Sequence, residues 1–116
     1  MDRAELGARA EALVAERLER AGFAVLARNA RVGRLEIDVI ARSGRLVVFC
    51  EVRARASDRF MSPAESIDRA KQGRVRRAAA AWLRAARLGD VDVRFDAASV
   101  VFDTPAGRIE YYENAF

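Results

Sequence analysis

Residues 34–55 read RLEIDVIARSGRLVVFCEVRAR and contain two apolar runs whose side chains alternate with period two. Such alternation is typical of strands, and Ser43-Gly44 between the runs indicates a hairpin turn. The runs also contain three carboxylates: Glu36, Asp38 and Glu51. Acidic residues are depleted in strands, so their presence in this hairpin calls for a chemical reason.

Side-chain parity predicts that two of these acids lie close together. Successive side chains of a strand point to opposite faces, so one face of the hairpin is expected to be apolar. Its residues are Leu35, Ile37, Val39, Ala41, Leu46, Val48, Cys50 and Val52. The opposite face is then apolar near the turn and charged at the open end. For a turn of two or four residues, Asp38 lies opposite Glu51 or diagonal to it, within roughly 8 Å.

The composition excludes several kinds of active site. The chain has 116 residues, no histidine and a single cysteine, Cys50. The absence of histidine rules out Ser-His-Asp and Cys-His catalysis, and one cysteine can form neither an internal disulfide nor a zinc site. Hydrolytic chemistry must therefore use carboxylates, Arg, Lys, Tyr or a hard cation such as Mg²⁺.

Length and composition predict a single soluble domain over residues 1–116, because 52% of the residues are hydrophobic and 33% are charged. No apolar run is long enough to span a bilayer and no signal-peptide pattern opens the chain, so we expect a cytoplasmic protein. A net charge of +4 and a pI near 10.2 favour nucleic acid as a partner. No membrane partner is expected, and a homodimer is left open.

Two helices and further strands are expected around the hairpin. Residues 2–22 have the apolar stripe of an amphipathic helix, with Asp2 as N-cap and Gly22 as its stop. A second helix is predicted from a capping box at 62–65 to about Leu88, after a mobile, basic loop. The loop is expected at 54–61, and further strands at 23–29, 91–103 and 108–112. This order predicts an α/β fold, with a mixed sheet flanked by helices.

Two close carboxylates on one face of a sheet indicate a divalent cation. Like charges at such range cannot both ionise in a half-buried place unless a cation or a proton separates them. Mg²⁺ accepts carboxylate and carbonyl oxygens as ligands and supports phosphodiester hydrolysis. The alternative is structural, with Asp38 and Glu51 in salt bridges to arginines, and the residues alone leave both readings open. Glu11 lies on the flank of the first helix's apolar stripe, from where it can reach the sheet edge.

Six segments, in order and at fitting distances, carry a family resemblance. They are GARAEALVAERLERAGF, EIDVIAR, FCEVRAR, SPAESIDRAK, RFDAASV and ENAF. Together they resemble the YraN-like family of small bacterial proteins, which is assigned to the restriction-endonuclease-like, or PD-(D/E)XK, fold shared by Holliday-junction resolvases. The resemblance covers nearly the whole chain. It implies a central mixed sheet flanked by helices, with Mg²⁺-dependent phosphodiester hydrolysis as the ancestral activity.

The resemblance also implies roles for individual residues. Asp38 matches the metal-bridging aspartate, Glu51 the acid of the (D/E)XK half-motif, and Glu11 the acid carried on a helix. The Val52 carbonyl would be a further ligand of Mg²⁺ or Mn²⁺. Glu36 belongs to the pattern as well, in a supporting or salt-bridge role.

The chain departs from the family pattern at the end of the EVK triplet, where Arg53 replaces the lysine. Lysine can orient or deprotonate a water, whereas arginine keeps its proton and supplies only positive charge and fixed donors. Lys71, the only lysine of the chain, stands where the family also carries lysine and could take over part of this role. Alternatively, its stem covers apolar surface with its head in water. Leu35 replaces a glycine of the family and could crowd the site's edge.

The sequence therefore predicts an endonuclease-like, metal-dependent protein that acts on nucleic acid, and on DNA in particular. Its candidate catalytic residues are Asp38, Glu51, Arg53 and Lys71. Its candidate phosphate contacts are Arg55, Arg69, Arg74 and Arg77, for which a solvated face is the alternative. The competing hypothesis is a catalytically inactive module that keeps the nuclease fold and binds nucleic acid or a protein.

Overall fold

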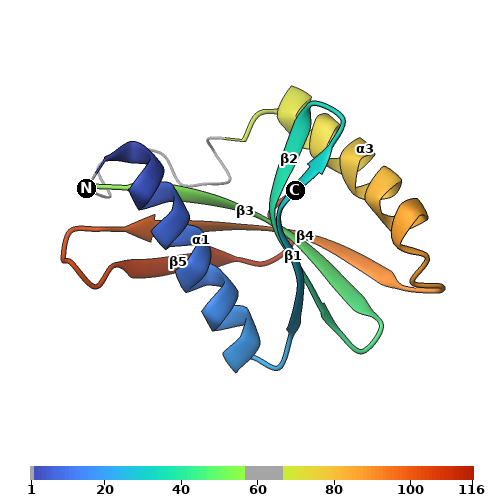
Figure 1. The fold of residues 1–116 in the computed structure, drawn as a ribbon, viewed down its shortest axis with the longest axis horizontal. Coiled ribbons are helices and arrows are strands. Elements are labelled where there is room, and N and C mark those ends of the chain that lie inside the picture. The colour runs from blue at the N-terminus through green and yellow to red at the C-terminus, as the bar shows by residue number, and fades with distance from the viewer. Residues whose placement is uncertain (1, 57–66) are drawn as a thin grey trace.

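A computed structural model describes residues 2–56 and 67–116, and its α/β architecture is shown in Figure 1. The elements are α1 (Arg3–Arg20), β1 (Ala24–Val32), β2 (Leu35–Ser43), β3 (Leu46–Arg55), α3 (Arg69–Ala86), β4 (Asp92–Val101) and β5 (Arg108–Tyr112). The five strands form one sheet in the order β1-β2-β3-β4-β5. The β3–β4 pair is parallel and the other three pairs are antiparallel. The predicted mixed sheet with flanking helices is confirmed, and it is consistent with a restriction-endonuclease-like fold.

Helix α1 covers one face of the sheet. Its N-cap is Asp2, whose side chain accepts a hydrogen bond from the Glu5 backbone N–H at 2.9 Å. After the helix, Gly22 adopts a φ of +94°, which favours glycine. The buried stripe of α1 packs on alternate residues of the three central strands. This cluster contains Ala10, Val14, Leu18, Val39, Ala41, Val48, Cys50, Ala98 and Val100.

Helix α3 covers the opposite face, since its cluster uses the other residues of β3, Val47 and Phe49. Ala78 and Ala79 of α3 are buried in this cluster, and Trp82 packs against it. The Trp82 ring meets that of Phe49 edge-on, with 5.9 Å between the ring centroids. Both faces of the sheet are therefore covered, which explains why β3 is apolar on both sides.

The prediction that the second helix runs unbroken through Ile67 is wrong. Asp68 has extended backbone and is the N-cap of α3, with its carboxylate accepting from the Lys71 N–H at 2.8 Å. The helix ends at Ala86, because Arg87 adopts the left-handed conformation. The predicted capping box at 62–65, and residues 57–61 of the predicted loop, lie outside the described residues. Arg55 and Ala54, which were assigned to that loop, belong to β3.

The predicted apolar face of the hairpin is correct for Val39 and Ala41 and wrong for Leu35 and Ile37. Ile37 and Ile40 are both buried against α3, and Leu35 packs beside them. Residues three positions apart in a regular strand would point to opposite faces. The alternation is therefore broken between Ile37 and Val39. The break lies at Asp38, and it coincides with an irregular point of the neighbouring strand β1, where Asn29 adopts a φ of +51°.

The hairpin turn is one residue later than predicted. Ser43 pairs with Leu46, so the two-residue turn is Gly44-Arg45, and Gly44 adopts a φ of +59°. A second hairpin, between β1 and β2, turns at Gly33-Arg34. In the part of the chain that the structure describes, no helix combines the length and apolarity that a membrane crossing requires. The single domain remains a prediction.

Candidate functional site

The candidate acids lie where β2 separates from β3. The pairing of these strands ends at Val39 and Cys50, whereas β3 stays paired with β4 as far as Arg55. The β2-facing edge of β3 is therefore open to side chains beyond Cys50. Extending the β2–β3 register by one pair brings Asp38 opposite Glu51, which is the direct one of the two arrangements that the sequence left open.

Hydrogen bonds hold Asp38 against this open edge. The Val52 N–H donates to Asp38 Oδ2 at 2.8 Å, and the Asp38 N–H donates to Glu51 Oε2 at 3.4 Å. The N–H and C=O groups of one strand residue point to the same edge. The Val52 carbonyl therefore faces the same edge as the Asp38 carboxylate.

Glu11 reaches the same place from α1. Its half-buried carboxyl group lies near the side chains of Asp38 and Asn29, both of which influence its pKa. Burial raises the pKa of Glu11 above its ordinary value, and the nearby charge of Asp38 raises this pKa further. Three elements, α1, β2 and β3, thus each contribute one carboxyl group.

Asp38 and Glu51 place two carboxyl groups close together in a largely buried environment. Burial, followed by the charge of Asp38, raises the pKa of Glu51 to about 7. Burial also raises the pKa of Asp38, although the hydrogen bond from Val52 and the charge of Lys71 act in the opposite direction. Carboxyl groups in this situation favour a bound proton or a bound cation.

Lys71 supplies positive charge to these acids and lowers the pKa of both. Its Nζ lies 3.6 Å from Glu51 Oε1, and 30% of its side chain is exposed. Two capping contacts fix the helix turn that carries it: Asp68 accepts from the Lys71 N–H, and Gln72 Nε2 donates to the Ile67 carbonyl at 3.0 Å. The structure thus places the head of Lys71 beside the acids rather than on a purely solvated face.

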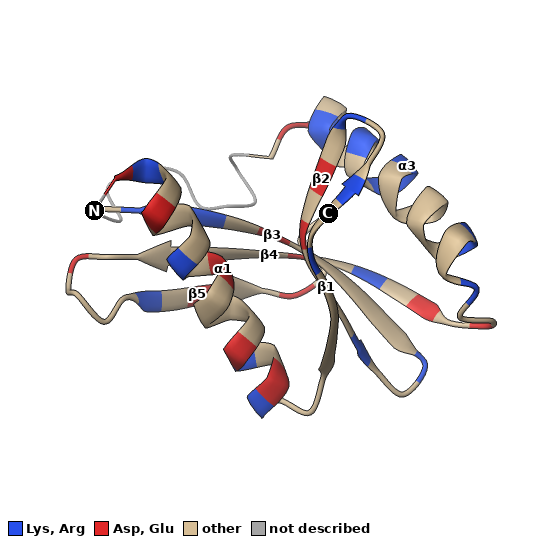
Figure 2. Cartoon of the chain, viewed as in Figure 1, with Lys and Arg blue, Asp and Glu red and all other residues tan. Residues whose placement is uncertain are grey.

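The candidate arginines occupy different surroundings. Arg53 is exposed, two residues beyond Glu51 on β3. Arg55 donates from Nε to Ser99 Oγ at 2.9 Å and lies 4.0 Å from Glu110, so its guanidinium group faces β4 and β5. The remaining candidates on α3 are exposed, and Figure 2 shows basic residues along this helix and at the nearby β1–β2 turn. They are Arg69, Arg74 and Arg77.

Sequence reasoning missed Asn29, whose side chain lowers the pKa of Glu11 from an irregular point of β1. An asparagine within a strand pattern was its signal, since Asn tolerates positive φ. Arg34 lies in the β1–β2 turn, which Gly33 between two alternating runs indicates. Glu36 is exposed and contributes a charge that raises the pKa of Asp38.

The donor set contains only oxygen: three carboxyl groups and the carbonyl of Val52. Such a set suits Mg²⁺ or Mn²⁺ and not a soft metal. Among the residues described, no three His, Cys, Asp or Glu side chains already stand close enough to hold an ion. The oxygen donors and their raised pKa values suit such a cation. The described side chains would have to rotate to bring three carboxyl groups around it.

Comparison with known proteins identifies the family of this chain. The model of Uncharacterised protein family UPF0102 matches residues 10–100, which include every candidate acid and Lys71. A UPF0102 protein of Sorangium cellulosum is 47% identical, over 98% of this chain and 82% of its own length. UPF0102 proteins of Geobacter metallireducens (38% identical, covering 96% and 91%) and Dictyoglomus turgidum (37%, covering 100% of both) are also similar. The chain belongs to the UPF0102, or YraN-like, family.

Proposed function

We propose that this protein is a metal-dependent nuclease that hydrolyses phosphodiester bonds in DNA. The observation that carries the proposal is the hydrogen-bonded approach of Asp38 and Glu51 at an open strand edge. Glu11 of α1 lies near enough to this pair for the charge of Asp38 to raise its pKa. A fold consistent with that of restriction endonucleases supports it, as does the basic α3 beside the acids.

The proposed ligands of Mg²⁺ or Mn²⁺ are the carboxylates of Asp38, Glu51 and Glu11 and the carbonyl of Val52. The hydrogen bond from the Val52 N–H holds the Asp38 carboxylate against β3. This bond limits the freedom of Asp38, so that Glu11 and Glu51 are the groups expected to adjust. The raised pKa values of all three acids indicate a lack of positive charge that a cation would supply.

An ion held by these residues would supply Lewis-acid chemistry, namely activation of a water and polarisation of the phosphodiester. The positive groups of the chain act on the substrate itself. Lys71 lies within 3.6 Å of Glu51 and can bind a phosphate oxygen or orient a water at the same acids. Arg53, exposed beyond Glu51, can stabilise charge that develops on the phosphate, but it cannot accept a proton.

The test is cleavage of labelled single-stranded, duplex and four-way-junction DNA in Mg²⁺ or Mn²⁺. Asp38→Asn and Glu51→Gln are each expected to lower the rate by at least about 100-fold, because each removes a group that stabilises transition-state charge. Glu11→Gln has a matched control in Glu19→Gln, an exposed acid on the same helix. The first should slow cleavage and the second should not.

Two outcomes would overturn the assignment of the site. Cleavage that survives both Asp38→Asn and Glu51→Gln would come from a contaminant. Equal cleavage rates for Lys71→Met and the wild type would show that Lys71 has no part in the mechanism. Arg53→Gln tests Arg53 in the same way.

A second function is favoured by one observation: the ion pair between Lys71 and Glu51 already compensates part of the buried charge. Together with Arg53 in place of lysine, it supports a catalytically inactive module that binds nucleic acid or a protein. Absence of cleavage on every substrate, with no rise in melting temperature on adding Mg²⁺ or Mn²⁺, would favour this module.

A further inference from the structure

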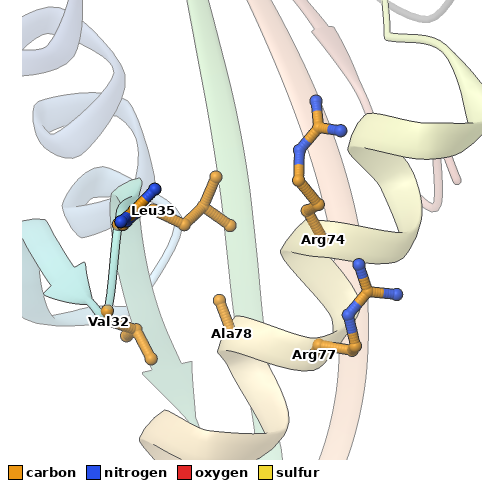
Figure 3. Close-up of a pocket in the computed structure, with 7 residues that line it drawn as sticks. Val32, Leu35, Arg74, Arg77 and Ala78 are labelled. Carbon is orange, nitrogen blue, oxygen red and sulfur yellow. The ribbon is translucent and has the colours of Figure 1, made fainter.

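A pocket lies between the β1–β2 turn and α3, and Figure 3 shows its walls. Its volume is about 520 Å³, within the range of roughly 300–1,000 Å³ that ligand sites occupy. The residues that line it are Val32, Gly33, Arg34, Leu35, Arg74, Arg77 and Ala78.

The pocket combines an apolar floor with a basic rim. Val32, Leu35 and Ala78 form the floor, and the Leu35 side chain extends from β2 towards α3 (Figure 3). The rim has three arginines, Arg34, Arg74 and Arg77, for which no ion pair is found within residues 2–56 and 67–116. Clustered positive charge attracts phosphate, and the apolar floor suits the face of a base.

The pocket adjoins the candidate site along two elements. Arg74 follows Lys71 by three residues on α3, so the two side chains lie on neighbouring turns of one side of the helix. Leu35 precedes Asp38 by three residues on β2, a separation of about 10 Å at the rise of a strand. About three nucleotides cover that distance at the 3.4 Å spacing of one DNA strand.

We propose that this pocket binds an unpaired nucleotide of the DNA substrate, within a few nucleotides of the phosphodiester bond that is hydrolysed at the acids. The three arginines hold the phosphates of that strand, and Val32, Leu35 and Ala78 contact the base. A base inside a duplex is stacked and paired, so it cannot enter such a pocket without being extruded. The inference rests on the proposed function, and it narrows the substrate to DNA with unpaired nucleotides.

Binding is measured by fluorescence anisotropy in EDTA, so that hydrolysis does not contribute. The probes are a single strand, a blunt duplex, and a duplex with a five-nucleotide overhang. The wild type is expected to bind the single strand and the overhang about tenfold more tightly than the blunt duplex, since each contacted base adds affinity. Equal affinity for all three probes would overturn the proposal.

Substitutions separate the phosphate contacts from the base contact. Arg74→Gln combined with Arg77→Gln should lower the salt dependence of binding by about two phosphate contacts on every probe. Arg84→Gln is the control, because Arg84 is exposed on the same helix and does not line the pocket. If the double variant behaves like Arg84→Gln, the rim arginines do not bind phosphate.

Leu35→Gln should abolish the preference for unpaired DNA and leave the salt dependence unchanged. Leu35 is half-buried, so a second measurement uses the wild-type protein. In a methyl NMR titration with a five-residue oligothymidylate, the signals of Val32 and Leu35 should shift, while that of Val14, which α1 buries against the opposite face of the sheet, should not. Shifts that exclude Val32 and Leu35 would refute the base contact. The two proposals can fail separately. If the binding test refutes the pocket, the cleavage test of the acids still stands. If no DNA is cleaved, binding to the pocket can still be measured in EDTA.

Discussion

Two places in the sheet bury carboxyl groups, and they differ in how the charge is compensated. Asp96 on β4 is fully buried and its acceptor positions are filled. Arg94 donates to both of its oxygens at 2.9 Å, and Tyr111 Oη and the Asn114 N–H add two further bonds at 2.5 and 2.9 Å. Near Asp96, the tail is held to β4 by the bond from the Ala115 N–H to the Phe95 carbonyl.

Asp38 and Glu51 lack such compensation. They share Lys71, which lies 3.6 Å from Glu51, and burial raises the pKa of both. The comparison shows that burial of an acid does not by itself indicate a functional site. A buried acid whose bonds are complete stabilises the fold, whereas an undercompensated group of acids is suited to bind a proton or a cation.

The largest effect is expected from Asp96→Ala, which leaves Arg94 without its main partner. Loss of one member of a buried ion pair should lower the free energy of unfolding by on the order of 4 kcal/mol. Urea unfolding at neutral pH measures this, with Asp38→Ala as the matched change in the other group. A loss for Asp38→Ala as large as that for Asp96→Ala would contradict the difference in compensation between the two groups.

Glu51→Gln is expected to stabilise the protein at pH 8. The folded-state pKa of about 7 exceeds the ordinary value of 4.5, so the wild type loses stability as the pH rises from about 4.5 through 7. The gain of the variant should be near zero at pH 4 and on the order of 3 kcal/mol at pH 8. Thermal unfolding at several pH values measures it, and a gain that does not depend on pH would contradict the shifted pKa.

Tyr111→Phe is expected to cost about 2 kcal/mol of unfolding free energy, because it removes a hydrogen bond to the buried carboxylate of Asp96. Tyr112→Phe is the neighbouring control. Urea unfolding of both variants measures the difference, and indistinguishable midpoints would show that the bonds to Asp96 are redundant.

The smallest effect is expected from Mg²⁺ on the wild type. At ten times its dissociation constant, the ion should add about 1.4 kcal/mol to the unfolding free energy. The gain should be smaller at pH 6 than at pH 8, because protons compete at Glu51. Thermal unfolding with and without Mg²⁺ measures it. Tyr111→Phe should keep this stabilisation and Glu51→Gln should lose it; equal gains for the two variants would place the ion elsewhere.

Local signals in the sequence were sufficient for much of the fold. Period-two alternation and turn residues predicted the strands, and Asp2 with Gly22 predicted the ends of α1. The approach of Asp38 to Glu51 was also predictable, because a two-residue turn sets the register of a hairpin. The face of Ile37 was not, since the alternation breaks at Asp38, opposite an irregular point of the neighbouring strand at Asn29.

The sequence by itself determined which residues alternate, where helices are amphipathic, and which acids share a hairpin, because these properties depend on neighbours a few positions apart. Only the tertiary structure decided that Glu11 and Lys71 meet those acids. They come from helices on opposite faces of the sheet, and both reach the acids because β2 leaves β3 after Cys50. That separation arises from packing between distant segments, for which no local pattern in the chain provides a signal.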